Sequence, residues 1–226
     1  PLNYMGDPLV WWDWGIDGPT NKAVLESWKF TENADGSVDY SLVIKPNIKF
    51  HKGWGTVTST DIKFNFTENL KEGTVNGNRR HYANFYGADP KNLDDSNPLV
   101  LKVHQPAKFN IIEMFRVFSA EETRGIRPFP KAYLEKVGEK EFAASPVFAG
   151  PYEFTSSSRG YDVLLTAVDD HYRITPGFKQ IHYFKVLDLA TKVAMLRTGQ
   201  IDMGIIPGRL AKEVAAAGID IVISKN

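Results

Sequence analysis

The sequence predicts a mixed α/β (α+β) domain, and three observations lead to this prediction. Several short segments alternate apolar and polar residues with the period of a half-buried strand. Other segments have helical periodicity together with capping and stop signals. Strands and helices do not alternate strictly, so we expect a mixed sheet rather than a purely parallel one. The 226 residues are enough for one large domain or two small ones.

The segment from Val38 to Leu70 has the clearest order of predicted elements. Residues 38–44 alternate as a strand, and Pro46 ends it because proline donates no hydrogen bond to a neighbouring strand. Thr58 and Asp61 have the spacing of a capping box at the positive end of a helix dipole. The apolar residues of that helix then recur at four-residue spacing on one face: Ile62, Phe66 and Leu70. We predict that this segment has a scaffolding role.

The remaining elements follow in chain order. A tight hairpin turn is expected at Asn33–Gly36, where Asp-Gly supplies the positive φ that such turns need. Residues 72–97 are interpreted as a loop rich in glycine and asparagine, either an edge of a ligand site or a surface excursion whose aromatic residues tuck beneath it. Further strands are expected at residues 23–30, 99–103, 152–155, 160–167, 181–186, 201–203 and 219–223. Further helices are expected at residues 110–118, 131–137, 189–197 and 210–217.

Composition excludes several classes of function. Lysine and arginine together number 27, as do aspartate and glutamate, so no overall field favours nucleic acid. The absence of cysteine excludes disulfides, thiolate metal sites and cysteine nucleophiles. No run of residues reaches the length of a membrane span. The chain begins at Pro1 rather than at methionine, which indicates a processed or trimmed start.

No motif in the sequence indicates catalysis. The five histidines are scattered without metal-ligand spacing, and no nucleophile elbow, phosphate-binding loop or dinucleotide fingerprint is present. The adjacent carboxylates, such as Asp169 and Asp170, rarely face one another and are interpreted as solvated groups. An enzyme would therefore need catalytic groups dispersed along the chain. The sequence favours binding without a metal or cofactor.

The order of several motifs resembles the extracellular solute-binding proteins of family 5. These proteins are the peptide, oligopeptide and nickel-binding components of ABC importers. The resemblance begins with Leu25-Glu26-Ser27-Trp28, the Asp-Gly hairpin and Ile48–Gly53. It continues with the segments Thr60–Phe64, Gly150-Pro151-Tyr152, Asp170-His171-Tyr172 and Ala194–Asp202. Arg173 stands where the family usually has tryptophan.

The resemblance implies a two-lobed periplasmic-binding-protein-like fold of class II, cluster C type. Residues 1–226 would be the N-terminal part of lobe I, truncated relative to the family, with the second lobe missing. It further implies a monomer outside the cytoplasmic membrane, periplasmic or extracellular, whose full-length form can carry a lipid anchor. The expected partners are a peptide or other small solute and a membrane permease.

A cleft wall of aromatic and cationic groups would suit peptides or anionic chelates. Three indoles fall within four positions near the N-terminus, where core packing and ligand contact are equally open interpretations. The family also places cleft contacts near the N-terminal strand and ahead of the helix that begins at Pro130-Lys131. The residues predicted to bind ligand are Trp11, Trp12, Trp14, Tyr82, Phe85, Arg124 and Arg127. Trp28, Gly150 and Arg173 are interpreted as structural.

Three functions remain open at this point. The first is the substrate-binding component of an ABC importer, which binds a solute and does not turn it over. The second is an enzyme of hydrolase type, and the third is a receptor that senses a peptide. Binding of a solute without turnover distinguishes the first from the second.

Overall fold

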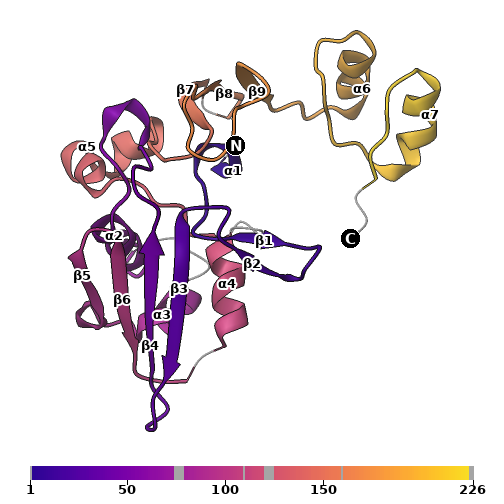
Figure 1. Cartoon of the computed structure of the whole chain (residues 1–226). Helices are drawn as coiled ribbons and strands as arrows, with labels where there is room; N and C mark the ends of the chain where they lie inside the picture. The colour runs from indigo at the N-terminus through magenta and orange to yellow at the C-terminus, as the bar shows by residue number, and fades with distance from the viewer. Residues whose placement is uncertain (1, 74–78, 109, 120–124, 159, 224–226) are drawn as a thin grey trace. The chain divides into compact units, whose positions relative to one another are not determined.

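The computed structural model describes residues 2–73, 79–108, 110–119, 125–158 and 160–223, and it forms two compact units. The first unit contains Pro1–Ser157 and Val163–His182, and the second contains Ser158–Asp162 and Tyr183–Asn226. Strands and helices are both present throughout the larger unit (Figure 1). This confirms the predicted mixed α/β class.

A four-stranded sheet forms the centre of the first unit. Its order is β3 (Leu25–Glu32), β4 (Val38–Ile44), β6 (Val100–Gln105) and β5 (Leu93–Asn97). Every neighbouring pair is antiparallel. The expected mixed pattern is therefore wrong for this sheet. Short turns join β3 to β4 and β5 to β6, while the long segment with α2 and α3 returns the chain so that β6 pairs antiparallel with β4. The predicted turn at Asn33–Gly36 is confirmed, with Gly36 at φ 86°.

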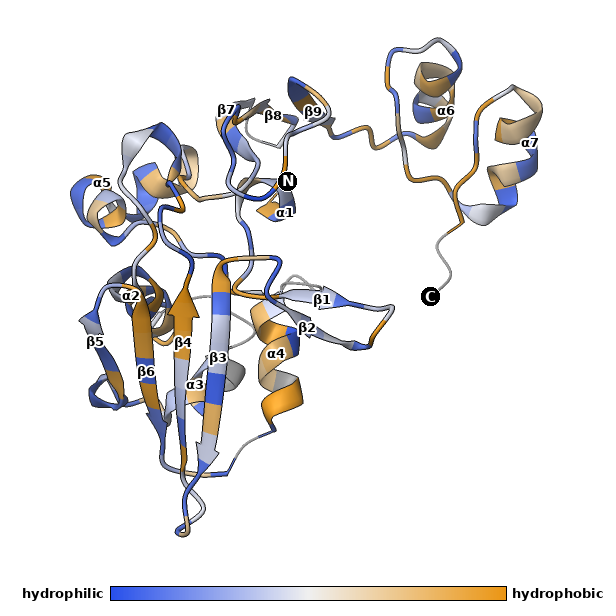
Figure 2. Cartoon of the chain, viewed as in Figure 1, coloured by the Kyte–Doolittle hydropathy of each residue, from blue (hydrophilic) through white to orange (hydrophobic). Residues whose placement is uncertain are grey.

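Helices cover one face of this sheet and bury its apolar side chains. They are α2 (Ser59–Glu68), α3 (Arg79–Tyr86) and α4 (Ile111–Ser119). In Figure 1, α2 and α3 lie behind the strands, and α4 is seen beside β3. Strand β4 alternates as predicted: residues 38, 40, 42 and 44 are buried, and the residues between them are not. Figure 2 shows hydrophobic residues concentrated in β4, β6 and α4. The sheet's opposite face is polar.

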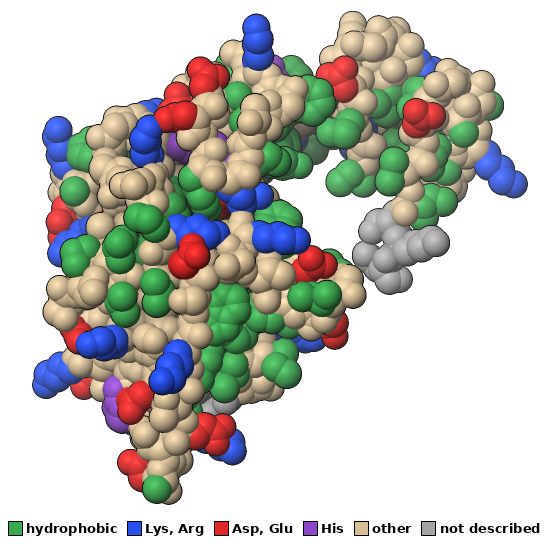
Figure 3. Space-filling model, in the orientation of Figure 1, with side chains coloured by type: hydrophobic (Ala, Val, Ile, Leu, Met, Phe, Trp, Pro, Cys, Tyr) green, Lys and Arg blue, Asp and Glu red, His purple; other side chains and the backbone are tan. Residues whose placement is uncertain are grey.

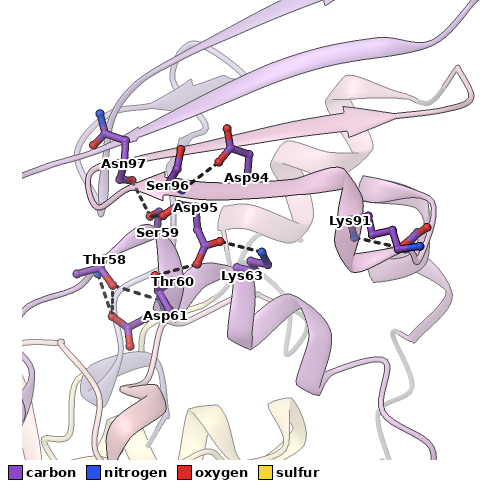
Figure 4. A network of polar contacts seen from close by, with 11 residues as sticks. Thr58, Ser59, Thr60, Asp61, Lys63, Lys91, Asp94, Asp95, Ser96 and Asn97 are labelled. Carbon is purple, nitrogen blue, oxygen red and sulfur yellow. Dashed lines mark hydrogen bonds and ion pairs between the residues drawn. The ribbon is translucent and has the colours of Figure 1, made fainter.

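The start of α2 has the predicted capping box. The side chain of Thr58 accepts from the backbone N–H of Asp61, and the Asp61 carboxylate accepts from the Thr58 N–H at 3.0 Å. Asp61 also accepts from the Lys131 N–H at 3.0 Å, at the first residue of α5 (Lys131–Ala144). Close by, Asp95 in β5 accepts from Thr60 and Lys63 at 2.8 and 2.7 Å (Figure 4). These bonds join α2 to α5 and to the edge of the sheet.

We expect Thr58→Ala to lower the free energy of unfolding by about 1 kcal/mol, because one helical N–H loses its capping acceptor. Urea unfolding followed by circular dichroism measures this change. Ser157→Ala, at an exposed position of β7 (Tyr152–Ser158), is the matched control and should change stability by less than about 0.5 kcal/mol. Equal stabilities of the two variants would contradict the capping role.

The segment between residues 72 and 97 departs from its interpretation as a loose excursion. Its described part contains α3 and β5. Tyr82, Phe85 and Tyr86 have helical spacing and are all buried against the sheet, so core packing stabilises a helix in a polar stretch. The first half of this excursion includes residues 74–78, which lie outside the described residues.

A separate two-stranded hairpin lies next to α4. It consists of β1 (Trp11–Asp13) and β2 (Gly18–Thr20), which pair antiparallel, and it follows α1 (Leu2–Met5). The backbone N–H groups of Leu9 and Val10 donate to the carbonyl of Phe118 at 3.0 and 3.3 Å. The base of the hairpin is thereby fixed to the end of α4.

Three further strands form a separate three-stranded sheet, of order β7–β8–β9. Here β8 is Asp162–Ala167 and β9 is Gln180–Phe184, and both confirm predicted strands. The second unit contains α6 (Leu189–Arg197) and α7 (Ala211–Ala216), which an ion pair between Arg197 and Glu213 joins at 3.0 Å. Gly199 follows α6 at φ 69°, as predicted for a residue that ends a helix.

The strands predicted at residues 201–203 and 219–223 are wrong, because no strand is assigned there in the described residues. Met203, Val222 and Ile223 are largely exposed. An extended segment becomes a strand only where a neighbouring strand pairs with its backbone groups. Periodicity alone therefore overpredicted these two elements.

Candidate functional site

The predicted tryptophans lie together on the β1–β2 hairpin, and their exposure differs sharply. Trp12 is buried, whereas Trp11 is 43% exposed and Trp14 is 70% exposed. The rings of Trp12 and Trp14 meet edge to face with centroids 6.2 Å apart, as expected for residues on one face of a strand. Core packing therefore holds for Trp12. Ligand contact by Trp11 and Trp14 stays a prediction.

A buried carboxylate lies just before this hairpin. Asp7 is almost fully buried and accepts two hydrogen bonds from Arg173, from Nε at 3.1 Å and from Nη2 at 2.7 Å. His171 Nε2 lies 3.2 Å from the same carboxylate. The Arg173 guanidinium also lies over the Trp11 ring, 5.0 Å from its centroid. The structural interpretation of Arg173 thus has a physical basis in this ion pair.

The charges of this cluster stabilise one another. Burial by itself raises the pKa of Asp7, but the hydrogen bonds from His171 and Arg173 outweigh it and hold the pKa at about 2. Burial likewise opposes the charge of Arg173, and the bonds to Asp7 keep the pKa of its guanidinium above the ordinary value. Both groups are therefore charged at neutral pH. Breaking the pair would leave one charge buried without compensation.

His51 connects the same region to the Gly-Pro-Tyr turn. Its Nε2 donates to the Gly150 carbonyl at 2.8 Å, and the Gly150 N–H donates to the Met5 carbonyl at 2.7 Å. Burial lowers the pKa of His51 to about 4, so the ring is neutral in the folded state at pH 7. Gly150 therefore joins the N-terminal segment to the connection that follows β4.

Because its pKa is lowered, His51 should make the fold less stable as the pH falls from about 6.5 to about 4. In that window the unfolded chain binds a proton that the folded chain does not, which lowers stability by about 3 kcal/mol in total. His51→Gln keeps an N–H donor for the Gly150 carbonyl and removes the titration. Urea unfolding between pH 7 and pH 4 should therefore give a flatter profile for the variant. Parallel profiles would show that His51 is not the titrating group.

The other predicted ligand residues lie in different surroundings. Tyr82 and Phe85 belong to the hydrophobic core, where Phe85 packs against Phe66 and Phe118. Arg127 is buried and donates to the Gly125 carbonyl at 3.1 Å and to the Asn3 side chain. Arg124 lies outside the described residues. Trp28, interpreted as structural, packs against Phe115 at a centroid distance of 5.1 Å.

Sequence reasoning did not identify Asp7, His171 and Lys45 as parts of one site. Asp7 and Arg173 are 166 positions apart, so no local pattern links them. The one sequence feature that pointed to this site was Arg173, which stands where the family that the chain resembles usually has tryptophan. Lys45 donates to the carbonyls of Asn21 and Ala23 and thereby fixes the strand that follows the hairpin.

A separate depression lies on the polar face of the four-stranded sheet. Its volume is about 440 Å³ and its walls include Lys29, Lys102 and His104. Figure 3 shows blue basic, purple histidine and red acidic side chains over this face. Its residues come from strands β3 to β6 and from the connection before β5, and none of them belongs to the Asp7 cluster. Within the described part of the chain, no three histidine or carboxylate side chains are arranged to hold a metal ion.

The fold is that of periplasmic solute-binding proteins. The chain aligns with the oligopeptide-binding protein AppA of Bacillus subtilis in complex with a nonapeptide, with a TM-score of 0.75 and 19% identity. It aligns with MoaA of A. tumefaciens R10 in complex with mannopinic acid, with a TM-score of 0.78 and 20% identity. It aligns with NikZ of Campylobacter jejuni in complex with Ni(L-His), with a TM-score of 0.66 and 21% identity.

The chain belongs to the bacterial extracellular solute-binding proteins, family 5, whose model matches residues 19–225. AppA of Bacillus subtilis is also a relative by sequence, 27% identical over 180 residues. These residues make up 76% of this chain and 31% of AppA. The three structures are matched over 88–95% of this chain and 37–42% of their own length. The chain thus spans well under half of the relatives it matches.

Proposed function

We propose that the protein is the substrate-binding component of an ABC importer. It captures a peptide-like or related small solute outside the cytoplasmic membrane, in the periplasm or extracellularly, and delivers it to a membrane permease. The observation that carries this proposal is the family match over residues 19–225. None of the described helices is long and apolar enough to cross a bilayer. A binding protein that meets its permease at the membrane surface is compatible with that finding.

The ligands of the relatives support a solute with at least one carboxylate. A nonapeptide, mannopinic acid and the nickel–histidine chelate occupy the three structures named above. For this chain we propose that the exposed rings of Trp11 and Trp14 contact the solute. Trp12, Tyr82, Phe85 and Arg127 are buried, so their contribution is to hold the ligand-facing surface in place. Arg124 completes the set of residues proposed to bind the solute.

The state of two described polar groups supports binding without turnover. In the Asp7 cluster each oxygen of the carboxylate accepts a hydrogen bond from the Arg173 guanidinium. A carboxylate paired with a permanently charged group in this way is a poor general base. The contact of His104 with Asp39, at 2.8 Å, lies on the exposed face of the sheet. Neither arrangement favours an enzyme. We infer that the solute leaves the protein unchanged.

A ligand panel tests the proposal. The full-length protein is heated with and without short peptides, opines such as mannopinic acid, and Ni(L-His), and its melting temperature is recorded. A ligand present at 100 times its Kd stabilises the folded state by about 2.7 kcal/mol, which is readily detected. We expect one class of solute to raise the melting temperature. No stabilisation by any class would contradict the proposal, and hydrolysis of a chromogenic ester or amide would favour an enzyme instead.

A further inference from the structure

Several charged side chains lie near the base of the β1–β2 hairpin. Arg173 and His171 contact the buried carboxylate of Asp7 directly, and the charge of Asp7 also acts on Lys45 and Arg127. Burial lowers the pKa of Lys45 and of Arg127, and the charge of Asp7 partly offsets this effect in both residues. Glu26, which also acts on Lys45, is exposed. Among the described residues that act on Lys45 and Arg127, Asp7 and Glu26 are the carboxylates.

Arg173 is held in one orientation at the surface of this cluster. Its two bonds to Asp7 use Nε and Nη2. The neighbouring Tyr172 hydroxyl also acts on the guanidinium and helps to raise its pKa, and no bond from Nη1 to another described residue is formed. The side chain remains 21% exposed. The Trp11 ring supports the flat face of the guanidinium, 5.0 Å from its carbon. A guanidinium anchored on one edge and stacked on one face is preorganised to bind a further acceptor on its remaining edge.

We propose that Arg173 and Trp11 form the subsite that recognises a carboxylate of the bound solute. The Nη1 amino group donates to the ligand carboxylate, and the exposed part of the Trp11 ring contacts the adjoining apolar part of the solute. Asp7 acts as a positioning residue, because it fixes the guanidinium and does not touch the ligand. The inference rests on the proposed function and deepens it, since it names the residues that select an acidic solute.

Trialanine and trialanine amide are suitable probes, because they differ only in the C-terminal charge. Their affinities for the full-length protein are measured by calorimetry. We expect the wild-type protein to bind trialanine at least tenfold more tightly than the amide. The double variant Asp7→Asn/Arg173→Gln removes both buried charges together and avoids an orphaned carboxylate. It should lose about tenfold in affinity for trialanine, as expected for a charge-assisted hydrogen bond, and keep its affinity for the amide.

Two further variants separate recognition from folding. Trp11→Leu leaves the ion pair intact and should weaken trialanine binding by about threefold, because the solute loses part of its apolar contact with the indole ring. Lys22→Gln removes the exposed ion pair of the same hairpin with Asp13 and should leave both affinities within about twofold. Circular dichroism confirms that each variant is folded.

The outcomes distinguish the two proposals. Equal affinities of the wild-type protein for the two probes, or an unchanged affinity of the double variant for trialanine, would overturn the carboxylate subsite. Failure of trialanine to bind while another solute of the panel binds would also overturn it and leave the importer function in place. If no solute of the panel binds, the proposed function fails, and the subsite fails with it.

Discussion

Replacing Arg173 by leucine is expected to lower the free energy of unfolding by about 4 kcal/mol at pH 7. The buried Asp7 carboxylate would lose both hydrogen bonds from the guanidinium, and an uncompensated buried charge costs about 3–5 kcal/mol. His171, whose Nε2 lies 3.2 Å from the Asp7 carboxylate, would then compensate part of that buried charge. Chemical denaturation at pH 7 measures the loss. A loss below about 1 kcal/mol would mean that the pair adds little to the fold.

The pH dependence of the same variant provides an independent test. In the wild-type protein the pKa of Asp7 is lowered from 3.8 to about 2. The ion pair therefore stabilises the fold above about pH 4, and about 2 kcal/mol is lost as the pH falls from about 4 to about 2. In Arg173→Leu burial dominates and raises the pKa of Asp7, so the stability deficit should shrink as the acid protonates. The double variant Asp7→Asn/Arg173→Gln is the control, because it lacks this titration.

Gly150→Ala is expected to destabilise the first unit by roughly 4 kcal/mol, near the upper end for a single substitution. A Cβ at this position would lie 2.5 Å from the carbonyl carbon of Met5 and 2.7 Å from the Gly6 nitrogen. Both are backbone atoms, so the N-terminal segment would have to move as a whole. Such a movement would also break the bond from the Gly150 N–H to Met5 and disturb the neighbouring Asp7.

The chain contains a matched control for this prediction. A Cβ at Gly177 would meet no atom within 4 Å, and its φ is not in the left-handed region. Gly177→Ala should therefore change stability by less than about 0.5 kcal/mol. Thermal unfolding of both variants gives the comparison. Similar melting temperatures would show that the N-terminal segment adapts to the added methyl group.

The parts of the fold that depend on local signals were predictable from the sequence. The capped helix that starts after Thr58, the Asp-Gly turn and the alternation in β4 each need only a few neighbouring residues, and all three are confirmed. The helix α3 was missed because polar and glycine residues around it suggested a loop. Its signal was the spacing of Tyr82, Phe85 and Tyr86, which bury one face against the sheet.

The candidate site was less predictable, because it is built by contacts between distant residues. The indoles of the hairpin are visible in the sequence, but their different exposures depend on packing against α4. The pairing of Asp7 with Arg173 depends on the Gly-Pro-Tyr turn, which brings residues near 150 against the N-terminal segment. No periodicity encodes such a contact. The family resemblance identified the order of motifs and left the charge cluster unassigned.

The measurement that tests the central claim most directly is recovery of a bound solute. The full-length protein is incubated with the solute that stabilises it most, dialysed to remove excess, and denatured to release what remains. Mass spectrometry then gives the amount and identity of the released molecule. We predict one equivalent of chemically unchanged solute per protein chain. Release of a cleaved or modified product would contradict a binding function and favour an enzyme.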